Sequence, residues 1–232
     1  MTVPIRWLLV LLPLLVGTMS FAGASPQTVE QVEFLDGIKN HKAAGTTPYV
    51  IGTTGYWDEG PQLSVSISAD GNVRPEALDA VREFIAGNQT ASNSATLVRW
   101  NGLLASLPNA PMLKLAASNE DANIKIILSE SAHPDGKMGK TRVSAIKGVR
   151  QILSAEVYVY SSNQVMEQGI LDPVVTHELG HALGLSHSTD PDSIMFSLLE
   201  VENGAVTNHI GSCEQHGISL LYEKLKIGNI EC

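Results

Sequence analysis

Three histidines and a glutamate stand at spacings that would let them bind a metal ion and activate water. His177 and His181 are four residues apart, so on a helix both imidazoles project from one face and can close on one metal. Glu178 lies one step around the same axis, where its carboxylate can reach a metal-bound water. His187, three residues after Gly184, can supply a third nitrogen. A zinc ion with three protein nitrogens keeps a position for water, which favours a catalytic site over a structural one.

The residues around these histidines carry signals for the elements that must position them. Asp172 is suited to cap a helix and Pro173 to fill its first position, so we expect a helix over about 173–184. Gly184 tolerates the left-handed conformation with which the chain can turn sharply out of that helix. Met195 alone would be typical of core filling, and only its spacing makes it informative. A bare His-Glu-x-x-His can also be an ordinary half-buried polar face, but the glycine, third histidine and methionine are further independent requirements.

This pattern resembles the metzincins, whose signature is H-E-x-x-H-x-x-G-x-x-H with a downstream Met-turn. Within them, the run from His187 to Phe196, with Ser188 directly after the third histidine, is similar to the matrixins, the matrix metalloproteinase family and its microbial relatives. The resemblance is most specific over residues 172–197. It implies an α+β, zincin-like catalytic domain: a twisted mixed sheet with an active-site helix and a C-terminal helix.

The resemblance also implies a role for each residue of the motif. His177, His181 and His187 would hold one catalytic Zn²⁺, and Glu178 would be the general base that acts on the attacking water. Met195 would form an apolar floor beneath the metal. The implied activity is a secreted zinc-dependent endopeptidase that hydrolyses peptide bonds in protein substrates.

Alternating apolar residues predict strands upstream of the motif, and an amphipathic pattern predicts a helix that opens at Pro75. By the resemblance, Thr141–Ile146 would be the exposed rim strand of the cleft, with Thr141, Val143 and Ala145 at the substrate. An exposed edge can accept an extended peptide through main-chain hydrogen bonds, which fits a peptide substrate. The predicted strands cover 63–68, 122–128, 139–147 and 155–160.

Two regions are harder to predict. Residues 87–111 are less regular than the family's first helix, so we expect an insertion or a second helix there, and Asn88 begins a glycosylation acceptor. After the motif we expect a loop over 196–212 and a helix over 214–225. Ser197 stands where animal matrixins usually have proline or tyrosine-proline nearby, which leaves the outer wall of the specificity pocket open.

The N-terminus has the pattern of a secretory signal peptide. Arg6 precedes an apolar run from Trp7 to Val16, and Ala22-Gly23-Ala24 matches a cleavage site. We therefore expect a signal peptide at 1–24, an N-terminal arm or short propeptide at 25–47, and a metallopeptidase domain at 48–232. The expected location is extracellular, with no stable membrane insertion after cleavage; an uncleaved N-terminal anchor is the alternative.

The cysteines bear on compartment and on latency. Cys213 and Cys232 are the only two, and in an exported protein an even pair favours a disulfide, the alternative being two free thiols. Animal matrixins stay latent through a prosegment cysteine on the zinc. This chain has no cysteine before the motif, so a thiol switch of that type is excluded.

The composition is typical of one globular domain. Of 232 residues, 44% are hydrophobic and 17% charged, and the net charge of −9 gives no electrostatic footprint for nucleic acid. The acidic surplus fits solubility, with Ca²⁺ or cationic partners as a second option. His133-Pro134-Asp135 is similar to the start of the matrixins' structural zinc site, but no histidine follows between 136 and 176, so we expect that zinc to be absent. We expect a monomer.

Two other function classes remain open. One is a non-catalytic, zinc-stabilised binding or adhesion module on a protease scaffold, although the intact Glu178 disfavours it. The other is a zinc hydrolase of small amide substrates, which would share the chemistry and differ in its cleft.

Overall fold

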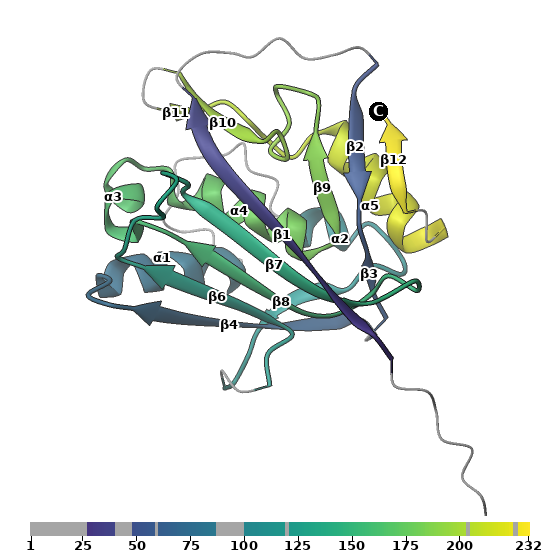
Figure 1. Cartoon of the computed structure of the whole chain (residues 1–232), viewed down its shortest axis with the longest axis horizontal. Helices are drawn as coiled ribbons and strands as arrows, with labels where there is room; N and C mark the ends of the chain where they lie inside the picture. Colours follow the sequence, from purple (N-terminus) through teal and green to yellow (C-terminus); the bar gives the residue numbers. More distant parts are fainter. Residues whose placement is uncertain are drawn as a thin grey trace, which may run out of the picture.

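The computed structural model describes residues 27–39, 48–58, 60–86, 100–118, 121–202, 205–224 and 227–232. Its larger sheet has the order β11-β10-β1-β7-β8-β6-β4-β5, with β3 paired to β8 (Figure 1). The strands β4, β5, β6 and β8 run parallel to their neighbours in that group, whereas β7 is antiparallel to β8. The sheet comprises β1 (Val29–Lys39), β3 (Tyr56–Trp57), β4 (Gln62–Asp70), β5 (Met112–Leu115), β6 (Ile124–Ser129), β7 (Gly139–Ile146), β8 (Gln151–Val159), β10 (Leu198–Glu202) and β11 (Ala205–Val206).

The core lies between this sheet and its helices. Alternation places Ile124, Ile126 and Leu128 of β6 on the buried side, as expected for a strand with one face in the core. The helices are α1 (Pro75–Ala86), α2 (Trp100–Leu104), α3 (Ser162–Glu167), α4 (Leu171–Ala182) and α5 (Ser212–Lys224). The α+β class is confirmed, as are the four predicted strands, the helix opening at Pro75 and the C-terminal helix. The second helix expected within 87–111 is α2.

A smaller sheet lies beside the end of α4. It has the order β12-β2-β9, formed by β12 (Gly228–Glu231), β2 (Val50–Thr53) and β9 (Leu185–Ser188). Cys213, in the first turn of α5, and Cys232, just after β12, lie at disulfide distance with their Cα atoms 5.0 Å apart. This pair links the last helix to the last strand.

The start of α4 differs from the prediction. The helix begins at Leu171, with Ile170 as its N-cap residue and no side-chain cap. Asp172 therefore lies in the first turn instead of capping it, a position that still suits its charge at the positive end of the helix dipole. The reason for the earlier start is burial, because Ile170 and Leu171 are both 4% exposed or less.

Two further predictions about strands are wrong. Residues 196–212 are not simply a loop, because they contain β10 and β11. Thr141–Ile146 is not an exposed edge, because β7 lies between β8 and β1. Both differences have one cause: residues 29–39, expected as an arm or propeptide, form a strand that pairs antiparallel with β7 and parallel with β10.

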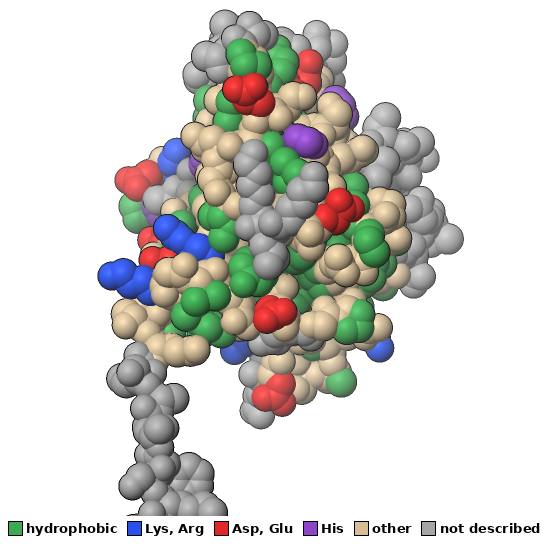
Figure 2. Space-filling view, turned by 90° about the vertical axis from the view of Figure 1, so that its right-hand side faces the viewer, with side chains coloured by type: hydrophobic (Ala, Val, Ile, Leu, Met, Phe, Trp, Pro, Cys, Tyr) green, Lys and Arg blue, Asp and Glu red, His purple; other side chains and the backbone are tan. Residues whose placement is uncertain are grey.

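Some predictions lie outside the described residues, namely the signal peptide at 1–24 and the acceptor at Asn88. Among the helices that the structure describes, none is both long and apolar enough to cross a membrane. On the face drawn in Figure 2, acidic side chains are dispersed and do not gather over one element.

Candidate active site

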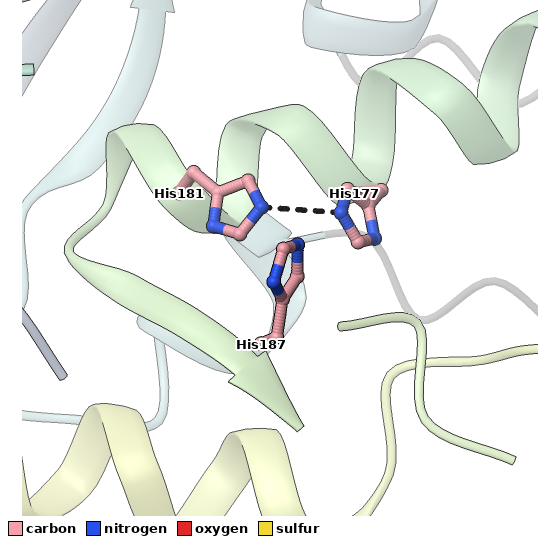
Figure 3. A group of neighbouring side chains, drawn as sticks. All are labelled: His177, His181 and His187. Atoms are coloured by element: carbon pink, nitrogen blue, oxygen red, sulfur yellow. Dashed lines mark hydrogen bonds between the residues drawn. The ribbon is translucent and has the colours of Figure 1, made fainter. Parts of the chain in front are cut away.

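The three histidines of the motif converge from two elements. His177 and His181 project from one face of α4, and His187 comes from β9, after the turn at Gly184 (Figure 3). One nitrogen from each imidazole lies within 4.8 Å of the others. Gly184 has φ +103°, and a side chain there would overlap the carbonyl of Gly55. The predicted turn is confirmed, and it requires glycine for both reasons.

Hydrogen bonds fix which nitrogen of each helical histidine faces the centre. The Nδ1 of His177 contacts the carbonyl of Ile194, and the Nδ1 of His181 lies 2.9 Å from the carbonyl of Leu185. A carbonyl oxygen only accepts, so both Nδ1 atoms must carry the proton. The two Nε2 atoms, 3.1 Å apart, then turn lone pairs toward each other.

This donor set fits a zinc ion. Facing lone pairs repel unless a cation or a proton lies between them. Zinc–nitrogen bonds of about 2.0–2.1 Å in a tetrahedral site place ligand nitrogens roughly 3.3 Å apart. The backbone carbonyls that hold the Nδ1–H groups are the kind of outer partner that orients ligand histidines. His177 is 1% exposed and His181 is fully buried, so the site excludes most water on that side.

Glu178 lies against β7. The Thr141 hydroxyl is 2.5 Å from the Glu178 Oε2 and 3.0 Å from its backbone carbonyl, so its single proton serves one acceptor at a time. A side chain at position 139 would overlap the Glu178 carboxyl group, so Gly139 is needed for this close approach. The strand thus fixes the carboxylate beside the histidines.

Met195 lies buried beneath α4. Its sulfur sits where a side chain at Gly180 would otherwise be, so the glycine allows the turn to approach the helix closely. Glu214, fully buried at the start of α5, accepts hydrogen bonds from the Ser193 hydroxyl, from the Met195 N–H at 3.4 Å and from the Gly211 N–H at 2.7 Å. The bond to Gly211 is the return half of a capping box. One carboxylate therefore links the Met-turn to the last helix.

Aromatic donors hold α4 in place. The indole N–H of Trp100 donates to the carbonyl of Thr176 at 2.8 Å. Trp57 donates to the carbonyl of Ala182 at 2.8 Å, and the Tyr222 hydroxyl donates to the carbonyl of Leu183 at 3.0 Å. The last two carbonyls lie at the helix end, where no further turn can satisfy them. Burial raises the pKa of Tyr222, which keeps its hydroxyl a donor.

A small apolar pocket opens beside Glu178. β10 and the residues before it form one wall, and α4 forms the other. Ser197, where the sequence left the outer wall of the specificity pocket undetermined, is part of this wall. The lining residues are Met138, Gly139, Val174, His177, Glu178, Phe196, Ser197 and Leu199.

The opposite side of the site is covered by β1. The ring of Phe34 stacks on His181 with centroids 4.0 Å apart and planes 6° apart, and its edge faces His187 at 6.1 Å. Phe34 is paired in register with Thr141 of β7. The side chains of Thr141, Val143 and Ala145 are 3% exposed or less, so they point into the core. These side chains are therefore too buried to contact substrate as expected, and only the backbone of β7 could do so.

A helix with H-E-x-x-H, a glycine turn that brings in a third histidine and a methionine packed beneath define a metzincin-type domain. Residues 109–223, about half of the chain, match the family model described as Matrixin. The chain is a matrixin-like metzincin.

Curated relatives match shorter segments. Matrix metalloproteinase-20 of Homo sapiens is 41% identical over 54 residues, which cover 23% of this chain and 11% of that protein. Matrix metalloproteinase-2 of Drosophila melanogaster is 43% identical over 49 residues, 21% of this chain and 6% of that protein. Matrilysin of Felis catus is 74% identical over 23 residues, 10% of this chain and 9% of that protein. The matches thus span about a tenth or less of each relative's length.

Sequence reasoning missed several residues that the structure places at the site. Glu214 had a signal, because it follows Gly211 at capping-box spacing just ahead of a predicted helix. Trp100 had none, since its partner is 76 residues away in the chain. Thr141 was predicted at the substrate rim, but its contact with Glu178, 37 residues away, had no signal. Phe34 also had none, because its contact depends on which strand pairs with β7. His133, which resembles the start of the structural zinc site, lies in a turn where its Nδ1 accepts a hydrogen bond from the Asp135 N–H at 3.2 Å.

Proposed function

We propose that this protein is a secreted zinc-dependent endopeptidase. The observation that carries the proposal is the convergence of His177, His181 and His187 next to the carboxylate of Glu178. The matrixin match supports the same reaction class. Export rests on the predicted signal peptide at 1–24, with 48–232 as the catalytic domain and an uncleaved N-terminal anchor as the alternative.

Each residue of the site has a distinct task in this proposal. The three histidines would hold one Zn²⁺, which when bound supplies a Lewis acid and lowers the pKa of water. Glu178 accepts the proton from the attacking water and passes it to the leaving amine. Thr141 positions the Glu178 carboxylate from β7. Met195 and Glu214 keep the floor beneath the histidines in one arrangement.

An extended peptide is the substrate class that fits the surroundings. β7 and β10 border the site, and each can offer backbone hydrogen bonds to one strand lying between them. The apolar pocket beside Glu178 suits a hydrophobic side chain of that peptide, and the wall at Phe196 and Ser197 would set its size. The proposed reaction requires neither calcium nor a second metal ion.

The alternative functions do not require all the features found at the site. A zinc-stabilised binding module has no need of a carboxylate held against the histidines by Thr141 and Gly139. A hydrolase of small amides has no need of two strand edges at the site. We therefore favour the peptidase over the binding module and over the small-amide hydrolase. The small-amide hydrolase would use the same catalytic chemistry as the peptidase.

The test compares wild type with Glu178→Ala, using casein and a quenched peptide library, with zinc measured in both proteins. Because β1 covers the site, each protein is assayed before and after limited proteolysis that removes residues up to about 45. We expect the treated wild type to cleave, and the variant to keep zinc and lose at least ~100-fold of the rate. If both retain zinc and neither cleaves any peptide, a binding module is the better reading.

A further inference from the structure

A second cavity, with a volume of about 460 Å³, shares no lining residue with the pocket beside Glu178. It lies where β3 and the turn after it meet the loop before β5 and one residue of α5. Its lining includes three aromatic rings, two prolines and the side chains of Asp58 and Asn109. Cavities of roughly 300–1,000 Å³ are the size class that holds small molecules, so this one is large enough for a ligand or for a long side chain.

The walls of this cavity are fixed before any ligand arrives. Trp57 and Tyr222, both 5% exposed or less, use their polar tips to donate hydrogen bonds to the carbonyls at the end of α4. At the rim, the Pro61 carbonyl accepts from the Met112 N–H at 2.9 Å, which ties the residue before β4 to the start of β5. Walls that need no ordering lower the entropic cost of binding, so even a small ligand can bind measurably.

The charge of the lining selects the kind of ligand. Asp58 is the only Asp, Glu, Lys, Arg or His among the described residues that line the cavity, and its side chain is exposed. Asn109 adds a neutral polar group beside it. An anion would be repelled by Asp58 and would find no basic partner in the lining. An ammonium or guanidinium group would find a carboxylate acceptor, and such charge-assisted hydrogen bonds are the stronger ones.

The rings of the lining suit the rest of such a ligand. Tyr56 is half-buried, so part of its ring remains open to the cavity, and a cation within about 6 Å of a tyrosine ring is attracted to its face. Pro61 and Pro108 are exposed, and the methylene groups of a lysine or arginine side chain can pack along such apolar surfaces. Together these groups match an alkyl chain that ends in a cation.

We propose that this cavity is a binding site for a guanidinium- or ammonium-bearing chain, with the cation beside Asp58 and the alkyl part against Tyr56 and the two prolines. All of these residues lie outside the metal-binding motif, so the proposal goes beyond the proposed function and does not depend on catalysis. Free amines and the arginine side chains of proteins share this chemistry, and the experiment separates the two sources.

Binding of a charged compound and of its neutral analogue is the first readout. N-acetyl-arginine amide is titrated into the full chain by calorimetry, and N-acetyl-citrulline amide, which has nearly the same shape without the charge, is the matched compound. We expect saturable binding of the arginine compound to wild type. Binding should be at least ~5-fold weaker for the citrulline compound and for Asp58→Asn. Asp121→Asn, at an exposed aspartate outside the lining, should bind as wild type does.

Tyr56 locates the bound compound independently. Tyr56→Leu removes the ring and should weaken binding at least ~3-fold, whereas Tyr56→Phe keeps the ring and should bind as wild type does. The proposal is overturned if wild type, Asp58→Asn and Tyr56→Leu bind equally, or if the two compounds bind equally. Should Tyr56→Leu not fold, Asp58→Asn and the two compounds decide the same question.

A peptide distinguishes the sources of the cation. A pentapeptide with a central arginine between alanines is titrated into Glu178→Ala, which prevents cleavage. Binding at least ~10-fold tighter than that of the arginine compound would assign the cavity to a protein partner, and equal binding would assign it to a small cation. Compounds that bind as predicted to a protein that cleaves nothing would leave the cavity proposal intact while the peptidase proposal fails. A protein that cleaves peptides but binds neither the arginine compound nor the pentapeptide in this cavity would show the reverse.

Discussion

Two strands border the histidine cluster, and they are attached in different ways. β9, which carries His187, pairs with β2, and the Ser188 N–H donates to the Met195 carbonyl at 2.7 Å. Leu185 and Ser188 of β9 are buried. β1, which carries Phe34, is held at its described side chains by that buried ring, by the partly buried Val32 and by ion pairs of Glu30 and Glu33. The metal-binding side is therefore held mainly by buried contacts, whereas the covering side depends in part on solvent-exposed ion pairs, which are individually weak.

The largest expected effect is on the β9 side. His187→Ala removes one of three zinc ligands, and we expect zinc affinity to fall by more than ~100-fold, beyond the loss seen when only an outer partner of a ligand is removed. His216→Ala, an exposed histidine on α5, is the control and should bind zinc as wild type does. Competition with a chelator measures both. Equal affinity of the His187 variant and wild type would remove His187 from the metal site.

Next in size is the loss of the link between the Met-turn and α5. Glu214→Gln keeps the shape but replaces one acceptor oxygen by a donor, so part of the set formed by Ser193, Met195 and Gly211 is lost. We expect the free energy of unfolding to fall by about 1–3 kcal/mol, as for a buried group left without its partner. Urea denaturation measures this, with Glu223→Gln on the exposed side of α5 as control. An unchanged midpoint would mean that Glu214 does not hold the turn.

A smaller effect is expected where β7 meets the carboxylate. Thr141→Val removes the hydroxyl proton donated to Glu178, and we expect kcat to fall roughly tenfold, equivalent to about 1.4 kcal/mol. Thr141→Ser keeps the donor and should restore most of the activity. Because the contact positions Glu178 and does not touch substrate, KM should change little. A rise in KM with unchanged kcat would assign Thr141 to substrate binding instead.

The smallest effect concerns the ion pairs of β1. Hydrogen bonds from Lys140 first and Arg142 second lower the pKa of Glu33 below its ordinary value of 4.5. A carboxyl group whose pKa is lowered on docking helps to hold the strand above pH 4.5, and this help is lost as the pH falls through the lowered value. Arg142 also lies 3.5 Å from Glu156 on β8, which shares its charge.

Binding of a peptide of residues 27–39 at pH 7 and pH 4 to metal-free protein measures this. Lowering the pH from 7 to 4 should weaken binding of the wild-type peptide more than binding of the Glu33→Gln peptide. We expect the extra loss to be a factor of up to about five, because exposed ion pairs are screened by water. All other groups are the same in both measurements, so the difference between the peptides isolates Glu33. An identical pH dependence of the two peptides would show that the pairs do not contribute.

The same contrast explains what the sequence could predict. His177, His181, Gly184 and His187 are placed by helical geometry and one tight turn, so their spacing alone predicts their convergence. Met195 follows within the same local stretch. The β7 strand was also predictable, because its alternation reflects one buried face.

The pairing partners of the strands were not predictable. Whether residues 29–39 extend the sheet depends on the free edges of β7 and β10, more than 100 residues away in the chain. The run from Val29 to Lys39 mixes apolar residues such as Phe34 and Ile38 with charged residues and a glycine, so neither face is regularly apolar and the pattern does not signal a strand. The contacts of Trp100 and Thr141 with α4 depend on the same long-range packing.

The most direct test is to cut the chain behind β1 after it has folded. A recognition site for a specific protease is inserted within residues 40–47. We then measure kcat/KM, zinc content and retention of the N-terminal fragment that carries β1, before and after cleavage. We predict unchanged zinc, release of the fragment on dilution and a rise in kcat/KM of at least ~10-fold. Release of the fragment without any gain in activity, in a protein that still holds zinc and cleaves peptide slowly, would contradict the account.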